Sequence, residues 1–335
     1  MKITIAFFFL IFSTYGFAQK VSFETLLNDK ISIRAITIYD NKVWYSGTNS
    51  KFGFVNLDNS KNQKRIKLSE KDLEFRTLAQ NEKYFFTINI ESPAYFFKIN
   101  KKDLTSEIVF KDTVKTAFYD ALHFVNNQTA YSFSDSDADR KLKLAIYKNQ
   151  KWSFFHNDIK LNEGEAAFAA SNSNIASYKN NMWIATGGKS SRILKINLKN
   201  QKIQFFNTPF IQGEASQGMY SIDFYKNLFG IAVGGDYTKQ EGNVNNIATT
   251  IDGGKTWQIV ASGKNSGYAT CVKIKPNSKG KEIVAVGDKH ISYSSDFGKT
   301  WTKISDEKGL YVCEWINKNT MAFAGKDRII KMTIN

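Results

Sequence analysis

The sequence predicts an all-β protein: a seven-bladed β-propeller made of four-stranded antiparallel blades. Three observations lead to this prediction. A turn motif occurs twice, short apolar segments recur every roughly 40 to 50 residues, and the C-terminal segment lacks the fourth strand of its own blade. A repeat of this length, built from short strands, is typical of propeller blades rather than of a two-sheet sandwich.

The turn motif follows the pattern Ser/Thr-x-Asp-x-Gly-x-Thr-Trp and spans residues 250–257 and 294–301. An aspartate carboxylate can accept backbone N–H groups across a hairpin turn, glycine tolerates positive φ, and tryptophan fills the space between sheets. We therefore interpret both copies as structural rather than catalytic. The residues concerned are Asp252, Gly254, Thr256 and Trp257 in the first copy and Asp296, Gly298, Thr300 and Trp301 in the second.

Seven short segments align as the innermost strands of the blades, the ones that would face the central axis. They are residues 33–36, 75–78, 119–122, 168–171, 220–222, 269–272 and 311–313. Seven such segments indicate seven blades. The last blade has three strands at 310–316, 320–324 and 328–334, so we expect residues 21–26 near the N-terminus to supply the fourth strand and close the ring.

The N-terminus has the composition of a cleavable signal peptide. Lys2 precedes an apolar run at 3–12 that is too short for a membrane span, and Gly16 and Ala18 suit a signal-peptidase site. We expect residues 1–18 to be removed after Ala18, and residues 19–335 to form one domain that is periplasmic or secreted, monomeric and without a membrane anchor.

Composition narrows the classes of ligand. The net charge of +15 comes almost entirely from lysine, whereas nucleic-acid sites favour the planar fork of arginine, so we expect no nucleic-acid partner. The three histidines are isolated, which predicts no metal site, and no motif requires a cofactor. Cys271 and Cys313 occupy similar positions in adjacent inner strands, and either a disulfide or two buried thiols is compatible with that.

Propeller ligands bind where inner strands and loops converge at one mouth of the central channel. The polar residues predicted there form the candidate ligand site: Arg34, Arg76, Asp120, Glu165, Arg192, Ser221 and Asp236. Arginine recognises carboxylates and phosphates through paired hydrogen bonds. The alternative interpretation is that these residues form ion pairs between blades and cap a water-filled channel. No catalytic residue is assigned.

Four stretches carry a resemblance to a known family: residues 164–171, 185–192, 218–222 and 233–237. With the two turn motifs, they make the chain similar to exported Bacteroidetes Asp-box (BNR-repeat) propellers related to the photosystem II stability/assembly factor. The resemblance implies a protein-binding or assembly role by analogy. Relatives of this type are often labelled oxidoreductase or glycosyl hydrolase.

The sequence leaves two enzymatic alternatives. A sialidase-like hydrolase or lyase needs an arginine cluster, a Tyr/Glu nucleophile pair and a separate acid, and only arginines can be assigned. An oxidoreductase would need a dinucleotide-binding turn in a βαβ unit, and Gly187-Gly188 and Gly234-Gly235 end strands instead. We therefore expect a non-enzymatic binding module for a protein partner or acidic glycan of the cell envelope.

Overall fold

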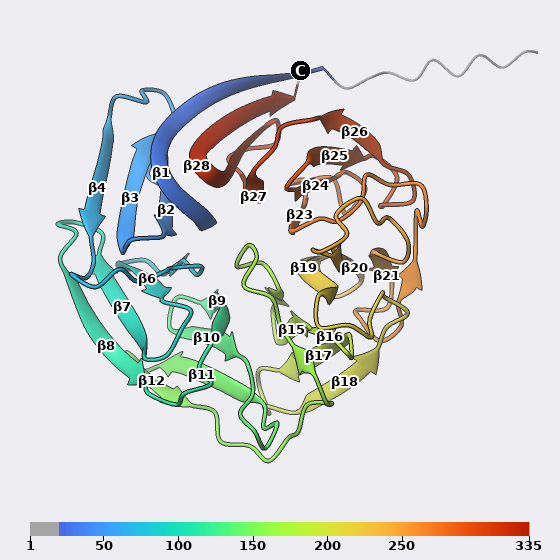
Figure 1. Ribbon diagram of the computed structural model, residues 1–335, viewed down its shortest axis with the longest axis horizontal. Helices are drawn as coiled ribbons and strands as arrows, with labels where there is room; N and C mark the ends of the chain where they lie inside the picture. Colours follow the sequence, from blue (N-terminus) through green and yellow to red (C-terminus); the bar gives the residue numbers. More distant parts are fainter. Residues whose placement is uncertain (1–19, 335) are drawn as a thin grey trace, which may run out of the picture.

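The computed structural model describes residues 20–334, which form a ring of antiparallel sheets around a central axis (Figure 1). Within this range the backbone forms strands, turns and loops, and it contains no helix that is long and apolar enough to cross a membrane. The predicted signal peptide and its cleavage site lie outside the described residues.

Four of the sheets have four strands each. In chain order they are β5 (Ala79–Gln80), β6 (Tyr84–Ile88), β7 (Ala94–Asn100) and β8 (Ser106–Asp112); β9 (Tyr119–Asn126), β10 (Thr129–Ser134), β11 (Lys143–Lys148) and β12 (Lys151–Phe154); β14 (Ile175–Tyr178), β15 (Asn181–Ala185), β17 (Arg192–Asn197) and β18 (Ile203–Asn207); and β23 (Cys271–Ile274), β24 (Ile283–Gly287), β25 (His290–Ser294) and β26 (Thr302–Ser305).

Two further sheets have six strands each. One has the spatial order β27 (Leu310–Trp315), β28 (Thr320–Ile334), β1 (Val21–Tyr39), β2 (Lys42–Gly47), β3 (Lys51–Asn56) and β4 (Gln63–Lys67). The other has the order β13 (Glu165–Ala166), β16 (Gly187–Gly188), β19 (Gln217–Tyr225), β20 (Phe229–Asp236), β21 (Ile247–Thr250) and β22 (Gln258–Ile259).

The prediction of seven separate blades is wrong, because the strands form six sheets. The reason lies in β1, a continuous strand of 19 residues. Its first part pairs with β28 from Val21 opposite Ile334 to Ser32 opposite Lys326, and its second part pairs with β2 from Ile33 onward. The two blades expected at the ends of the chain are thereby joined into one sheet. The expected pairing of the N-terminal strand with the C-terminal strand is present.

Neighbouring sheets pack through large aromatic side chains, and the apolar clusters lie between them. Trp44 packs on Phe85 with ring centroids 4.4 Å apart, and Trp183 stacks on Phe224 at 3.9 Å. Burial of such rings supplies much of the favourable free energy of a sheet-to-sheet contact. The aromatic residues therefore hold the sheets in a fixed ring around the axis.

Two of the predicted inner strands need correction. Residues 75–78 are largely irregular, with a single bridge from Phe75 to Asn89. Residues 168–171 do not form a strand. The inner strand of the sheet made by β14, β15, β17 and β18 is β14, and residues 167–174, which precede it, belong to no sheet. We call residues 167–174 the central loop, because it runs into the middle of the ring.

Candidate functional site

The central loop is tied to inner strands on different sides of the ring. The Asn172 side chain accepts a hydrogen bond from the Leu122 N–H at 2.8 Å and donates to the Leu78 carbonyl at 2.8 Å. The Ser171 hydroxyl donates to the Thr270 carbonyl at 2.6 Å. Because these contacts span the axis, the loop divides the channel into two cavities.

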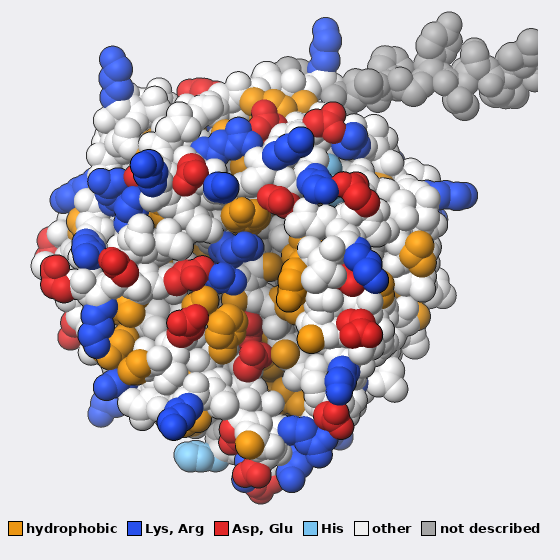
Figure 2. Space-filling view, viewed as in Figure 1, with side chains coloured by type: hydrophobic (Ala, Val, Ile, Leu, Met, Phe, Trp, Pro, Cys, Tyr) orange, Lys and Arg blue, Asp and Glu red, His pale blue; other side chains and the backbone are white. Residues whose placement is uncertain are grey.

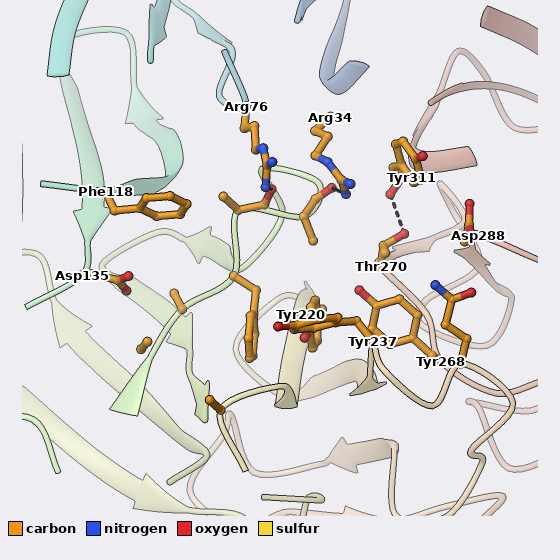
Figure 3. A pocket seen from close by; sticks show the side chains of 17 residues that line it. Arg34, Arg76, Phe118, Asp135, Tyr220, Tyr237, Tyr268, Thr270, Asp288 and Tyr311 are labelled. Carbon is orange, nitrogen blue, oxygen red and sulfur yellow. Dashed lines mark hydrogen bonds between the residues drawn. The ribbon is translucent and has the colours of Figure 1, made fainter. Parts of the chain in front are cut away.

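The first cavity has a volume of about 550 Å³, within the range of ordinary ligand pockets. Figure 2 shows one face of the ring hollowed at its centre, with basic, acidic and hydrophobic side chains around the hollow. The cavity is lined by the central-loop backbone and by charged and aromatic side chains, which include Arg34, Arg76, Phe118, Asp135, Tyr220, Tyr237, Tyr268, Asp288 and Tyr311 (Figure 3).

Two arginines point into this cavity from neighbouring elements (Figure 3). Arg34, in β1, lies over the Tyr311 ring at 4.1 Å and donates from Nη1 to the Ala170 carbonyl at 3.2 Å. Its buried Nε has no hydrogen-bond partner among the described residues. Burial lowers the pKa of Arg34, but a guanidinium remains charged at neutral pH. Arg34 can therefore donate to a ligand.

Arg76 is partly neutralised by its own neighbour. Its Nε donates to Glu74 Oε1 at 2.7 Å, and Nη1 lies 3.5 Å from the Ala169 carbonyl oxygen. This leaves the second terminal nitrogen, Nη2, without a hydrogen bond to the described residues. Arg34 and Arg76 together can bind an anionic group with more than one hydrogen bond.

Tyrosines form the wall opposite the arginines (Figure 3). Tyr220 stacks on Phe168 with centroids 3.8 Å apart and meets Tyr268 edge-on at 4.9 Å. Burial raises the pKa of both tyrosines, so their hydroxyls stay protonated at neutral pH. The Tyr220 hydroxyl donates to the Ser216 carbonyl at 2.8 Å, so this wall offers a ligand mainly apolar ring surface.

Two buried carboxyl groups lie beside the cavity. Asp135 lines it, and Asp120, in β9, is fully buried with no hydrogen-bond partner for either oxygen among residues 20–334. Burial raises the pKa of Asp135 to about 6. Burial and the nearby Asp135 charge raise the pKa of Asp120 well above its ordinary value, although Arg76 acts in the opposite direction. Asp120 therefore holds a proton more readily than an exposed carboxyl group.

These shifts predict that stability falls as the pH rises. An unfolded aspartate releases its proton near 3.8, whereas folded Asp135 retains it to about 6 and Asp120 retains its proton beyond the ordinary range. The native state then binds more protons than the unfolded chain, and the free energy of unfolding decreases with pH in this window. We expect Asp120→Asn to raise the urea midpoint at pH 7.5 and to flatten the pH dependence between pH 4.5 and 7.5. A lower midpoint for Asp120→Asn at pH 7.5 would contradict the assignment of a buried, unpaired carboxyl group.

The other predicted site residues lie away from this cavity. Glu165 in β13 and Arg192 in β17 bind each other, with both Glu165 oxygens 3.1 Å from Arg192 Nε. The Ser221 hydroxyl bonds to Ser173 at 2.7 Å inside the ring. The Asp236 carboxylate accepts from the Thr238 N–H at 2.9 Å and shapes its own loop. Of the seven predicted residues, Arg34 and Arg76 line the cavity, and Asp120 is buried beside its wall.

The two turn motifs have closely similar internal contacts. Asp252 Oδ1 accepts from the Lys255 and Thr256 N–H groups, both at 3.0 Å, and Asp296 Oδ1 accepts from the Thr300 N–H at 2.9 Å. Gly254 and Gly298 have φ values of 83° and 79°, which favour glycine. Despite partial burial, these hydrogen bonds lower the pKa of Asp252 to about 2. The carboxylates are occupied by the turn itself, as a structural role requires.

The sequence patterns do not single out the tyrosines of this cavity as site residues. Tyr220 and Tyr311 are the first residues of two predicted inner strands, one position before the place that Arg34 and Arg76 occupy in theirs. An aromatic residue at the start of several inner strands is therefore the sequence pattern that indicates these two tyrosines. Tyr237 and Tyr268 come from loops, and local sequence gives no such signal for them. No group of three or more His, Cys, Asp or Glu side chains in residues 20–334 could hold a metal ion.

Comparison with known proteins shows the fold. No family model and no curated protein matches the chain. Among solved structures, YCF48 bound to a D1 peptide superposes with a TM-score of 0.67 at 11% identity, covering 94% of this chain and 97% of that one. This similarity supports a β-propeller.

Two further neighbours are U3-55K and a streptogramin B lyase. U3-55K has a TM-score of 0.66 at 10% identity and covers 93% of this chain and 98% of its own. The lyase has a TM-score of 0.66 at 13% identity and covers 94% of this chain and 98% of its own. At such low identity these similarities establish an all-β propeller and leave the function to be argued from the site.

Proposed function

We propose that this chain is an exported, non-enzymatic binding module that takes a carboxylate-bearing peptide segment of a cell-envelope protein into the first cavity. The observation that carries this proposal is the pairing of Arg34 and Arg76 on one wall of a cavity whose other wall consists of tyrosines. Guanidinium groups bind a carboxylate, and tyrosine rings pack against the apolar parts of a peptide.

A peptide suits the size and the chemistry of the cavity. About 550 Å³ accommodates a short segment rather than a whole folded surface. The protein YCF48, which shares the propeller fold at 11% identity, has been solved with a D1 peptide. A carboxylate at a chain terminus or in an acidic side chain would reach both arginines.

The contacts favour binding over glycan hydrolysis. The residues that line the cavity include Asp135 and Asp288 but no glutamate, so a Tyr/Glu nucleophile pair is not assembled there. Burial raises the pKa of Tyr220 and Tyr268, which makes either hydroxyl a poorer nucleophile. These two observations support a site that recognises a ligand without transforming it.

The test uses a peptide library with free C-terminal carboxylates and acidic side chains, displayed against the purified chain of residues 19–335. We expect selected peptides to bind the wild type and to bind Arg34→Ala/Arg76→Ala at least about tenfold more weakly, because each lost charge-assisted hydrogen bond contributes about 1.5–3 kcal/mol. Fluorescence anisotropy with one selected peptide measures the change.

The matched control removes two arginines elsewhere. Arg65 and Arg140 are exposed and do not line the cavity, so Arg65→Ala/Arg140→Ala changes the net charge equally and should retain binding. Equal loss in both double variants would indicate nonspecific attraction to the basic surface. If no peptide is selected and the chain binds an acidic oligosaccharide instead, the ligand is a glycan and not a peptide.

A further inference from the structure

Cys271 and Cys313 lie side by side on adjacent inner strands, β23 and β27. Both are completely buried thiols, and their Sγ atoms are 3.8 Å apart. A disulfide needs a separation of about 2.05 Å, so the sulfurs have to approach by less than about 2 Å. Side-chain rotation supplies most of such a movement without a rearrangement of strands.

The pair is electrostatically asymmetric. The Cys313 S–H donates to Cys271 Sγ, and Lys273 adds positive charge nearby. Burial alone would raise the pKa of Cys271, but these two groups lower it to about 6. Burial raises the pKa of Cys313, as does the neighbouring sulfur. Cys271 is thus the more acidic thiol of the pair, and Cys313 donates its S–H to it.

A second cavity lies beside one of the two cysteines. This cavity has a volume of about 290 Å³. Its lining residues Ile36, Leu122 and Ile222 come later in the inner segments than the residues that line the first cavity, so it lies on the other side of the central loop. Cys313 lines this cavity, and so do Lys273 and Glu314. The side chains of Lys273 and Glu314 are 25% and 32% exposed, so the cavity opens to solvent.

We propose that Cys271 and Cys313 form an oxidative modification site that a small hydroperoxide, entering through the second cavity, converts to an intramolecular disulfide. Once Cys271 has released its proton to solvent, Cys313 Sγ passes its own proton to Cys271 and attacks the terminal peroxide oxygen. The O–O bond breaks, and for hydrogen peroxide the leaving hydroxide takes that proton from Cys271 and departs as water. This step leaves a sulfenic acid on Cys313.

Cys271 Sγ then bonds to Cys313 Sγ, the S–O bond breaks, and the leaving hydroxide takes a proton from solvent, which replaces the one that Cys271 released on ionisation, and departs as a second water. Two thiols lose two electrons and two protons, and one peroxide is reduced to two waters. The product links β23 to β27 across 42 positions of sequence. Such a link restricts the unfolded chain and thereby stabilises the ring.

The oxidation is tested on the purified, reduced chain of residues 19–335 with a small excess of hydrogen peroxide. We expect the mass to fall by two hydrogens, a non-reducing peptide map to join Cys271 to Cys313, and Tm to rise by about 5 °C. The rate should not depend on protein concentration. Dimers linked through these cysteines, or thiols that react in urea but not in the folded chain, would overturn the proposal.

Two single variants test whether the second cavity decides which thiol the peroxide oxidises first. Cys271→Ser keeps the thiol of the residue that lines the second cavity, so dimedone should trap a sulfenic acid on Cys313. Cys313→Ser leaves the thiol that does not line the cavity, and it should react at least about tenfold more slowly. Circular dichroism checks that both variants are folded. Equal trapping in the two variants would show that the second cavity does not control access.

Discussion

A variant that begins at Asp29 should fail to form a stable ring. It lacks the first part of β1, which pairs with β28 from Val21 opposite Ile334 to Asn28 opposite Arg328, and it lacks buried Leu26 and Leu27. Each buried leucine contributes about 2–5 kcal/mol, and the exposed edge of β28 loses its hydrogen-bonding partner. Because a whole domain is stable by only about 5–15 kcal/mol, we expect the urea transition to broaden and to shift by more than half of its midpoint.

Two point variants on the same strand calibrate this result. Leu27→Ala removes a side chain that is 4% exposed, and it should cost about 2–5 kcal/mol. Phe23 is 37% exposed, so Phe23→Ala should cost less than about 1 kcal/mol. If the truncated chain unfolds at the wild-type urea concentration, β1 does not close the ring in the way its pairing with β28 indicates.

The predictions that succeeded rest on local physics. The turn motifs at Asp252 and Asp296 predict hydrogen bonds within about four residues of the aspartate, and those bonds are present. The all-β class and the terminal strand pairing follow from short strands and an unpaired edge. Arg34 and Arg76 line the first cavity, as their register in the repeat predicts, and their role in binding a ligand stays a prediction.

The predictions that failed depend on contacts between distant segments. A repeat of seven apolar segments cannot show that β1 continues unbroken from one blade into the next, so the count of separate sheets was wrong. Residues 168–171 have the apolar composition of an inner strand, but Asn172 is held by Leu78 and Leu122, which are far away in sequence. Those contacts pull the segment out of the sheet, and the site is built around it.

The sequence places Glu165 and Arg192 at the ligand site. Their contacts with each other predict that removing Glu165 lowers the stability of the fold. The Glu165 side chain is 0% exposed and that of Arg192 is 12% exposed. Both carboxylate oxygens bind Arg192, and Thr186 donates to one of them at 2.7 Å. Glu165→Ala leaves a largely buried guanidinium without its counter-charge, which costs about 3–5 kcal/mol. Urea unfolding at neutral pH measures the loss.

An exposed ion pair close to Glu165 in the sequence serves as the control. Glu163 binds Lys189 at 2.9 Å, but their side chains are 76% and 57% exposed. Water and salt screen this pair, so Glu163→Ala should leave the urea midpoint close to that of the wild type. A binding role for Glu165 makes a different prediction: Glu165→Ala would weaken selected peptides while preserving the midpoint. A large midpoint shift in Glu165→Ala, with none in Glu163→Ala, would therefore assign the buried pair to holding β13 and β17 together beside the cavity.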